Sequence, residues 1–268
     1  MTTLIALAVT CLASPAAVEL PETSLAGPFA MPAAPGFDLA PAAIEDPPPE
    51  ELGKWKGTVS VGATYSDGNS DRKSATALAD ATLRREKDRY TFNFLWNYAK
   101  EDGVTTDRRT IGTAKYDYFL TKKTYLLANA SGESDLNALL DLRFIVGAGA
   151  GYQFLEDEKW KLSGEAGLAY VDENYKDNDA DAEYLAARLA YKAECKVNES
   201  LSAGQNGQIY PSLEDKEDVN ALVDTHAKLT LTEKMFAQFG WLFTWDNTPA
   251  AGTERVDNLL LLTLGWSF

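Results

Sequence analysis

The stretch that decides the fold is Glu254-Arg-Val-Asp-Asn-Leu-Leu-Leu-Leu-Thr-Leu-Gly-Trp-Ser-Phe268. If this stretch is a β-strand, alternate residues form a wholly apolar face that ends in two aromatic side chains. That face consists of Leu260, Leu262, Leu264, Trp266 and Phe268. The opposite face becomes smaller and more polar toward its end. A strand with an apolar lipid face and aromatic side chains at the interface is typical of outer-membrane β-barrels. The stretch therefore predicts the closing strand of a membrane barrel and the signal that assembly machinery would recognise.

The composition agrees with a barrel and excludes other classes of protein. Mean hydropathy is −0.26, and the sequence has no apolar run of about eighteen residues that could cross a bilayer as a helix. The formal net charge of −15 argues against nucleic acid as a partner, because phosphate would be repelled. Neither Cys11 nor Cys195 has metal-ligand spacing. We expect no disulfide framework and no cofactor.

The N-terminal part of the sequence differs from the rest. Residues 1–17 contain an apolar core followed by small residues, which predicts a signal peptide, although an atypical one because the first basic residue is Lys54. A lipid anchor on Cys11 is disfavoured, because Ala8 stands where lipoprotein signals carry Leu. Residues 18–53 are rich in Pro and acidic residues and contain no Lys or Arg, which predicts a disordered periplasmic segment. The outer-membrane β-barrel is expected over 54–268.

Segments of strand length with alternating side chains continue from Trp55 to Phe268. We predict twelve strands, at 55–66, 72–85, 89–100, 106–120, 124–133, 139–154, 160–174, 182–197, 200–210, 219–232, 235–246 and 255–268. Strands of about thirteen residues, at about 3.3 Å each and tilted by about 45°, can cross a hydrocarbon layer of about 30 Å. The predicted fold is an all-β, antiparallel, up-and-down transmembrane β-barrel of about twelve strands. A soluble β-sandwich is the main alternative.

Connections between the predicted strands alternate between short turns and longer loops, and an even strand count would place both ends of the barrel in the periplasm. The faces opposite the apolar ones carry charges that we expect in the lumen. They are Lys115, Asp117, Asp141, Arg143, Glu165, Asp224, His226 and Lys228, together with Asp80, Arg109 and Arg188. If these charges pair across the bore, the barrel is plugged; if they segregate, it conducts ions. The sequence leaves both open, because strand registers are not determined to one residue.

Two motifs resemble a known family. One is Trp55-Lys-Gly-Thr-Val-Ser-Val-Gly-Ala-Thr-Tyr-Ser-Asp-Gly-Asn-Ser70, and the other is Asp141-Leu-Arg-Phe-Ile-Val-Gly-Ala-Gly-Ala-Gly-Tyr152. Both resemble strands of the salt-induced outer membrane proteins, a bacterial family that is essentially a domain of unknown function. The resemblance covers about 55–268 and rests on Gly, Asn and aromatic residues, so it supports the fold more than an activity. It implies a Gram-negative outer-membrane barrel with a role in osmotic or salt stress.

Two groups of residues are candidates for a catalytic or metal-binding site. His226 could belong to a Ser/His/Asn hydrolase site, but Ala-Lys-Leu-Thr follows it with no Ser nearby, so a hydrated lumen histidine is favoured. Asp177, Asp179, Asp181 and Glu183 alternate along one loop and are a weak candidate for Ca²⁺. A solvated acidic loop is favoured there, because the Gly and Glu of an EF-hand are missing.

The sequence therefore predicts a non-enzymatic outer-membrane barrel with no catalytic residues. Its expected role is structural or in the passage of small solutes, supporting the envelope under ionic stress. An ion or small-solute diffusion channel is the alternative, and a hydrolase is less favoured. Expected partners are outer-membrane lipid, lipopolysaccharide and the barrel-assembly machinery. The oligomeric state is left open.

Overall fold

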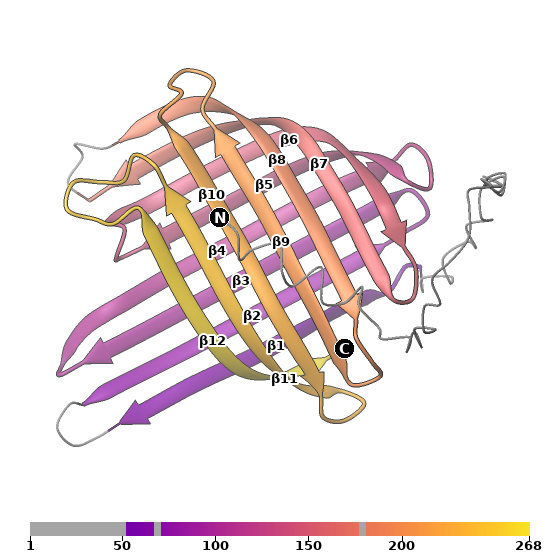
Figure 1. The fold of residues 1–268 in the computed structure, drawn as a ribbon, viewed down its shortest axis with the longest axis horizontal. Coiled ribbons are helices and arrows are strands. Elements are labelled where there is room, and N and C mark those ends of the chain that lie inside the picture. Colours follow the sequence, from indigo (N-terminus) through magenta and orange to yellow (C-terminus); the bar gives the residue numbers. More distant parts are fainter. Residues whose placement is uncertain (1–51, 67–70, 177–180) are drawn as a thin grey trace, which may run out of the picture. The chain divides into compact units, whose positions relative to one another are not determined.

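The computed structural model describes residues 52–66, 71–176 and 181–268, which form a closed β-barrel. In these residues, antiparallel strands follow one another around the wall in chain order, and β12 pairs with β1 to close it (Figure 1). The strands are β1 (Trp55–Ser66), β2 (Arg72–Arg84), β3 (Asp88–Glu101), β4 (Val104–Phe119), β5 (Thr124–Asp135), β6 (Leu140–Glu156), β7 (Trp160–Tyr175), β8 (Ala182–Lys196), β9 (Leu201–Pro211), β10 (Val219–Thr230), β11 (Met235–Asp246) and β12 (Val256–Ser267). All twelve predicted strands are present, with ends that differ by at most two residues. The predicted fold is confirmed.

The predicted signal peptide at 1–17 lies outside the described residues, as does the predicted 18–53 segment apart from its last two residues. Both stay predictions. Within the described ranges, no helix is long and apolar enough to cross a membrane.

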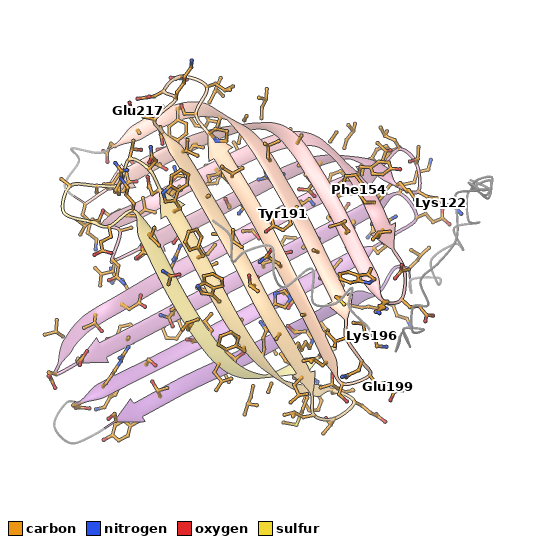
Figure 2. All side chains as sticks on the ribbon, viewed as in Figure 1. Lys122, Phe154, Tyr191, Lys196, Glu199 and Glu217 are labelled. Carbon is orange, nitrogen blue, oxygen red and sulfur yellow. The ribbon has the colours of Figure 1, made fainter. Side chains whose placement is uncertain are left out.

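Side chains alternate between the outside and the inside of the wall, as the sequence pattern predicts. On β12, Leu262 is 75% exposed, whereas its neighbours Leu261 and Thr263 are 8% and 3% exposed. Large apolar side chains such as Phe154 and Tyr191 are likewise exposed on the outer wall (Figure 2). So much apolar surface would be costly in water, and in hydrocarbon only a helix or a closed barrel satisfies its own backbone. The outer face is therefore one that lipid covers.

The two ends of the barrel differ in the length of their connections. At one end, which we call the turn end, three or four residues join consecutive strands, and Lys122 lies there (Figure 2). At the other, which we call the loop end, the 212–218 and 247–255 segments are the longest described connections, and Glu217 lies there. β1 begins and β12 ends at the turn end. In outer-membrane barrels the end with short turns faces the periplasm.

The start of β6 departs from the predicted alternation. A β-bulge lies between Leu140 and Leu142, so that Leu140 and Arg143 line the same internal cavity. The alternation of the predicted strand 139–154, with Asp141 and Arg143 in the lumen, places Leu140 on the lipid face, but Leu140 is 1% exposed inside the loop end. Asp141, expected in the lumen, is exposed at the bulge instead. These two expectations were wrong because one extra residue in a strand shifts the alternation, and nothing in the local sequence marks it.

The closing seam between β1 and β12 is paired along only part of its length. Its register comprises four residue pairs, of which Val61 with Leu264 is the nearest to the loop end. Main-chain hydrogen bonds also join Gly57 and Phe268, with N–O distances of 3.1 and 3.0 Å. On its other side, β1 pairs with β2 through all of its residues. The seam is thus the least extensively paired contact in the wall.

Gly265 gives the first test of how the seam closes. A Cβ at this position would overlap the ring of Phe236 and lie 2.7 Å from the Cβ of Ser60 on β1. We expect Gly265→Val to cost about 1 to 3 kcal/mol, because the barrel interior has no space for the added atoms. The loss would appear as a lower temperature for the gel-mobility shift that separates folded from heated barrel.

The matched control is Gly112→Val on the outer wall of β4, where a Cβ would meet nothing within 4 Å. This variant should keep the wild-type transition. Equal shifts in the two variants would contradict tight packing at the seam.

Candidate functional site

Most of the inward charges gather in two networks at different depths of the lumen. The loop-side network comprises Arg109, Glu133, Asp135, Arg143, Glu173 and Asp246. The turn-side network comprises Arg89, Lys115, Asp117, Glu165 and Arg188. Charges of opposite sign pair within each network, so they do not segregate by sign.

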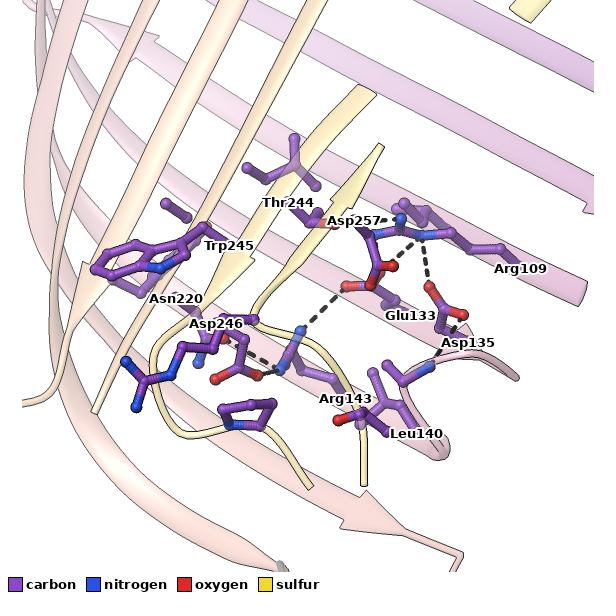
Figure 3. A pocket seen from close by; sticks show the side chains of 18 of the residues that line it. Arg109, Glu133, Asp135, Leu140, Arg143, Asn220, Thr244, Trp245, Asp246 and Asp257 are labelled. Atoms are coloured by element: carbon purple, nitrogen blue, oxygen red, sulfur yellow. Dashed lines mark hydrogen bonds and ion pairs between the residues drawn. The ribbon is translucent and has the colours of Figure 1, made fainter. Parts of the chain in front are cut away.

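Arg143 is the centre of the loop-side network (Figure 3). Its Nε lies 2.6 Å from Glu173 Oε1, its Nη1 lies 3.5 Å from Glu133 Oε2, and its Nη2 lies 2.9 Å from Asp246 Oδ2. Nη2 also donates to Asn220 Oδ1 at 3.2 Å. Arg143 is on β6 and Asp246 on β11, and β7 to β10 separate them along the wall. The ion pair therefore crosses the lumen.

A second contact crosses the lumen beside the first. Arg109 on β4 donates from Nη1 to Thr244 Oγ1 on β11 at 3.4 Å. Its Nη2 lies 2.5 Å from Glu133 Oε1 and its Nε lies 3.2 Å from Asp135 Oδ2. The side chain is only 5% exposed. A planar guanidinium with several donors suits this role, because it can bond the wall on both sides of the bore.

The 247–255 segment folds over the loop-side network. Ala250 packs against Leu140 and Tyr175, and all three are buried. On its other side the segment is tied to 212–218, because Thr248 Oγ1 donates to Asp218 Oδ1 at 3.1 Å. Burial, with a further contribution from the nearby Glu173 carboxylate, raises the pKa of Asp218 to about 6. This carboxyl in the 212–218 segment therefore becomes fully charged only above mildly acidic pH.

The turn-side network is built around Glu165 on β7. This carboxylate pairs with Arg188 at 2.9 Å and with Lys115, and it accepts a hydrogen bond from the Tyr125 hydroxyl at 2.9 Å. The ring of Tyr125 fills the place where a side chain on Gly151 would be. Gly151 therefore has a packing role, because its missing side chain leaves space for the Tyr125 ring.

The two networks and an apolar cluster fill one side of the lumen. The cluster consists of Ile145, Ala169, Val171, Tyr184, Ala186 and Tyr210, on β6 to β9. On β1 to β3 the inward side chains are mostly short, although Leu78, Leu95 and, near the turn end, the arginines Arg84 and Arg89 are longer. Thr64, Asp80 and Asn93 are exposed although they point into the barrel. The contacts of Arg143 and Arg109 with β11 thus divide the bore. We call the β4–β11 side the packed half and the β1–β3 side the open half.

Three other residues predicted in the lumen do point inward, near the turn end of β10. Asp224 lies 3.5 Å from His226, measured from Oδ2 to Nδ1. The His226 ring covers Gly204 on β9. Lys228 lies over the ring of Phe236, 3.9 Å from its centroid, and donates to Ser267 Oγ at 3.4 Å. These contacts are the kind that hold a lumen side chain in place.

The candidate Ca²⁺ residues are only partly described. Asp177 and Asp179 lie outside the described residues. Asp181 accepts a hydrogen bond from the Tyr175 backbone N–H, and Glu183 accepts one from a tyrosine hydroxyl. Over the described ranges, no group of three or more His, Cys, Asp or Glu side chains is placed to hold a metal ion.

The residues expected to form the assembly signal all lie outward on β12. Leu260, Leu262, Leu264, Trp266 and Phe268 are each at least 47% exposed. Phe268 also contacts Gly57 through the two main-chain bonds of the seam. The residues are therefore accessible from the lipid, and recognition by assembly machinery stays a prediction.

Several residues of the networks were not singled out from the sequence. They are Arg89, Tyr125, Glu133, Asp135, Glu173, Asn220 and Asp246. Glu133, Glu173 and Asp246 fall on the inward face of predicted strands, so strand parity alone could have found them. Strand parity shows that a side chain points into the lumen. It does not show which strands face each other across the bore, so it cannot predict which lumen charges form contacts across it.

A family model described as "Protein of unknown function, DUF481" matches residues 59–268, which is most of the chain. The chain belongs to the DUF481 family. This confirms the prediction of a barrel family defined by a domain of unknown function. A curated relative of this DUF481 chain is the "Uncharacterized protein YdiY" of Escherichia coli (strain K12). The two are 24% identical over 229 residues, which is 84% of this chain and 87% of YdiY.

Solved barrels show more distant likeness. The NanC porin aligns with a TM-score of 0.47 and 7% identity, over 80% of this DUF481 chain and 98% of the porin. The translocator domain of the autotransporter NalP from Neisseria meningitidis aligns with a TM-score of 0.43 and 10% identity, over 80% and 86% of the two chains. Location follows from the structure of this DUF481 protein itself. A closed, even-stranded barrel with an apolar outer face is a protein of the bacterial outer membrane.

Arg143 allows a test of the loop-side network. Replacing Arg143 with Leu leaves the carboxylates of Glu133, Glu173 and Asp246 without their central partner. We expect the free energy of unfolding to fall by about 3 to 5 kcal/mol, as when one partner is removed from a buried ion pair. Urea titration of the refolded barrel in detergent, followed by tryptophan fluorescence, would measure it.

Arg108→Leu is the matched control. Arg108 is the neighbour of Arg109 on β4, but its side chain is exposed on the outside of the wall. Its replacement should change the free energy of unfolding by no more than about 0.5 kcal/mol. A small effect in both variants would show that the network adds little to stability.

Proposed function

We propose that this DUF481 protein is a non-enzymatic outer-membrane barrel that lets small solutes pass through a narrow part of its lumen. The proposal rests on the Arg143–Asp246 ion pair. This pair crosses the bore and bounds the packed half, which side chains fill, so that only the open half remains for solutes. Along the open half, Asp80 and Asn93 remain exposed on the inner wall. A path lined by small polar side chains suits ions and small polar solutes, since they keep part of their hydration there.

A wide, permanently open diffusion channel is the alternative. Twelve strands enclose a modest bore even when the lumen is clear. Here the contacts of Arg143 and Arg109 with β11 reduce it further. The geometry therefore favours a narrow route over a porin-like one.

The absence of catalysis is part of the same proposal. His226 is partnered by Asp224 and packs on Gly204, an arrangement that fixes the ring without presenting a nucleophile to it. A base acts in hydrolysis when it lies within hydrogen-bond reach of a nucleophile. Lipase activity that disappears in His226→Ala would contradict this part of the proposal.

Support of the envelope under ionic stress is the physiological role that we propose for the barrel. The resemblance to the salt-induced outer membrane proteins supports it. The buried pairs of the packed half support it as well, because salt screens them less than exposed pairs. The barrel should therefore keep its narrow bore when the external ionic strength rises.

Single-channel recording from the refolded full chain in planar bilayers tests the narrow route. We expect small conductance steps for the wild type and larger steps for the double variant Arg143→Ala/Asp246→Ala, because removing both partners clears the ion pair from the bore without leaving Asp246 unpaired. Glu133 keeps its ion pair with Arg109, and Glu173 keeps the hydrogen bonds that Tyr175, Tyr184 and Asn220 donate. The control double variant is Lys192→Ala/Glu194→Ala. It removes an exposed pair of 2.8 Å whose two residues are both on β8, so it does not cross the lumen.

The possible outcomes separate three roles. Wild-type steps as large as those of the Arg143→Ala/Asp246→Ala variant would show an open porin. No steps above background in any of the three proteins would leave a structural barrel and reject solute passage. An increase in the Lys192→Ala/Glu194→Ala control would show that the change in conductance does not come from the crossing pair.

The stress role is tested by growth. A strain that lacks the gene should grow more slowly than its parent in medium of high salt, and the wild-type gene should restore its growth. The Arg143→Ala/Asp246→Ala gene should restore growth less well, because a wider bore dissipates gradients. Equal growth of deletion and parent strains at every salt concentration would reject the role.

A further inference from the structure

The wall has an unpaired stretch at the seam. β1 continues to Ser66 and β12 starts at Val256, but their register ends at the pair Val61 and Leu264. Both strands remain fully paired on their other sides, with β2 and β11. In the described part of the chain, residues 62–66 and 256–263 therefore have no strand partner across the seam. Figure 1 shows β12 and β1 diverging toward the loop end.

The pairing pattern identifies the backbone groups that face this stretch. Gly57 and Phe268 exchange two main-chain bonds, and such mutual pairs recur at every second residue of an antiparallel ladder. On β1 the next groups beyond the register are the N–H and C=O of Ala63. On β12 they are those of Leu262. The two strands still touch at this point, because a Cβ on Gly62 would overlap the Leu262 backbone oxygen, so they separate only beyond it. In hydrocarbon, each backbone group left without a partner costs several kcal/mol, so these edges require water, a ligand or a closing movement.

The cross-lumen contacts explain why β12 leaves β1. Asp246 ends β11 and is bound to Arg143 on β6. The connection from β11 to β12 then packs Ala250 against Leu140 and Tyr175. The loop end of the β11–β12 hairpin is thus held toward β6 and β7, which lie across the lumen from it in the packed half. The same contacts that narrow the bore keep the seam apart.

The two sides of the unpaired stretch differ in character. On the outer wall, Val61, Tyr65, Leu260 and Leu262 are each at least 65% exposed and belong to the most exposed large apolar side chains of the barrel. On the inner wall, β1 presents the small polar side chains of Thr64 and Ser66, whereas β12 presents Asp257 and the less exposed Leu259 and Leu261. Thr263, which points inward at the edge of the stretch, is 3% exposed, and its hydroxyl has no hydrogen-bond partner among the described residues.

We propose that the loop half of the β1–β12 seam is a lateral opening that admits a lipid of the surrounding membrane leaflet to the lumen. The head group would lie in the open half at the depth of the unpaired stretch, where the hydroxyls of Thr64 and Ser74 point inward and favour a head group that forms hydrogen bonds. The hydrocarbon chain would lie between the strands, on Leu260, Leu262 and Tyr65. This route is lateral and separate from the axial route of small solutes.

Cysteine pairs test whether the seam is open. In a Cys11→Ser/Cys195→Ser background, Val61→Cys/Leu264→Cys places thiols at the last registered pair. Tyr65→Cys/Leu260→Cys places them at a pair that would follow if the ladder continued, beyond the contact between Gly62 and Leu262. Both pairs lie on the outer wall, and a disulfide needs Cα atoms within about 7 Å. In membranes we expect rapid oxidation of the first pair and several-fold slower oxidation of the second. Equal rates would overturn the proposal.

Quenching by lipid tests the occupant. A bimane fluorophore is attached at Thr76→Cys on β2, or at Ser131→Cys on β5, in the same background. Both side chains point inward four residues from the loop end of their strands, but only β2 is near the seam. In vesicles of phosphatidylcholine with dibrominated chains, quenching at Thr76 should exceed that at Ser131 several-fold. Equal quenching would show that lipid does not enter by the seam.

A third arm links the opening to the cross-lumen contacts. Arg143→Ala/Asp246→Ala frees the β11–β12 hairpin and should bring the oxidation rate of Tyr65→Cys/Leu260→Cys close to that of Val61→Cys/Leu264→Cys. An unchanged rate would reject the role of the ion pair in holding the seam. These results do not depend on conductance, so a silent barrel with an open seam would reject axial passage and keep the lateral opening.

Discussion

A polypeptide in hydrocarbon has no water with which to pair its N–H and C=O groups, and this constraint organises the barrel. Every strand from β2 to β11 pairs with a neighbour on both sides, although the ladder of β8 with β9 begins only at Leu189. The alternating side chains follow from the constraint, because a wall one strand thick must present apolar atoms to lipid and can keep polar atoms only inside. At the seam, part of the backbone has no strand partner. Gly57 and Phe268 bond to each other there, and Gly265 allows the strands to pack closely where they do pair.

The lumen uses charge to set the shape of the bore. Burying ions is costly, and replacing a buried pair by apolar residues is often neutral or stabilising, so such pairs say more about geometry than about stability. Here Arg143 and Arg109 each bind carboxylates near them and a partner across the bore. Their contacts fix the β11–β12 hairpin against β6. Filling of one half of the lumen and separation at the seam are thus two results of one set of bonds.

The sequence predicts the barrel almost completely, because apolar and polar side chains alternate along each strand and turn-forming residues separate the strands. The lipid faces of β3 and β12 and the inward direction of Lys115, Arg143 and Glu165 follow from parity alone. Leu140 and Asp141 were misplaced, since a bulge leaves no local trace. The pairing of Arg143 with Asp246 could not be predicted either. It depends on how far the β11–β12 hairpin leans across the bore, which is decided by packing between residues distant in the sequence.

The order of the strands has a consequence for the way the barrel forms. β4 to β11, which build the packed half, are consecutive in the chain, and each pairs with its sequence neighbours. A curved sheet of these strands can therefore grow by short-range hairpins, at low entropic cost. The seam instead joins the first strand to the last, so loop closure over the whole barrel must come before its few bonds. We therefore expect closing to be the slow step of folding, and until it is complete two free edges can pair with another chain.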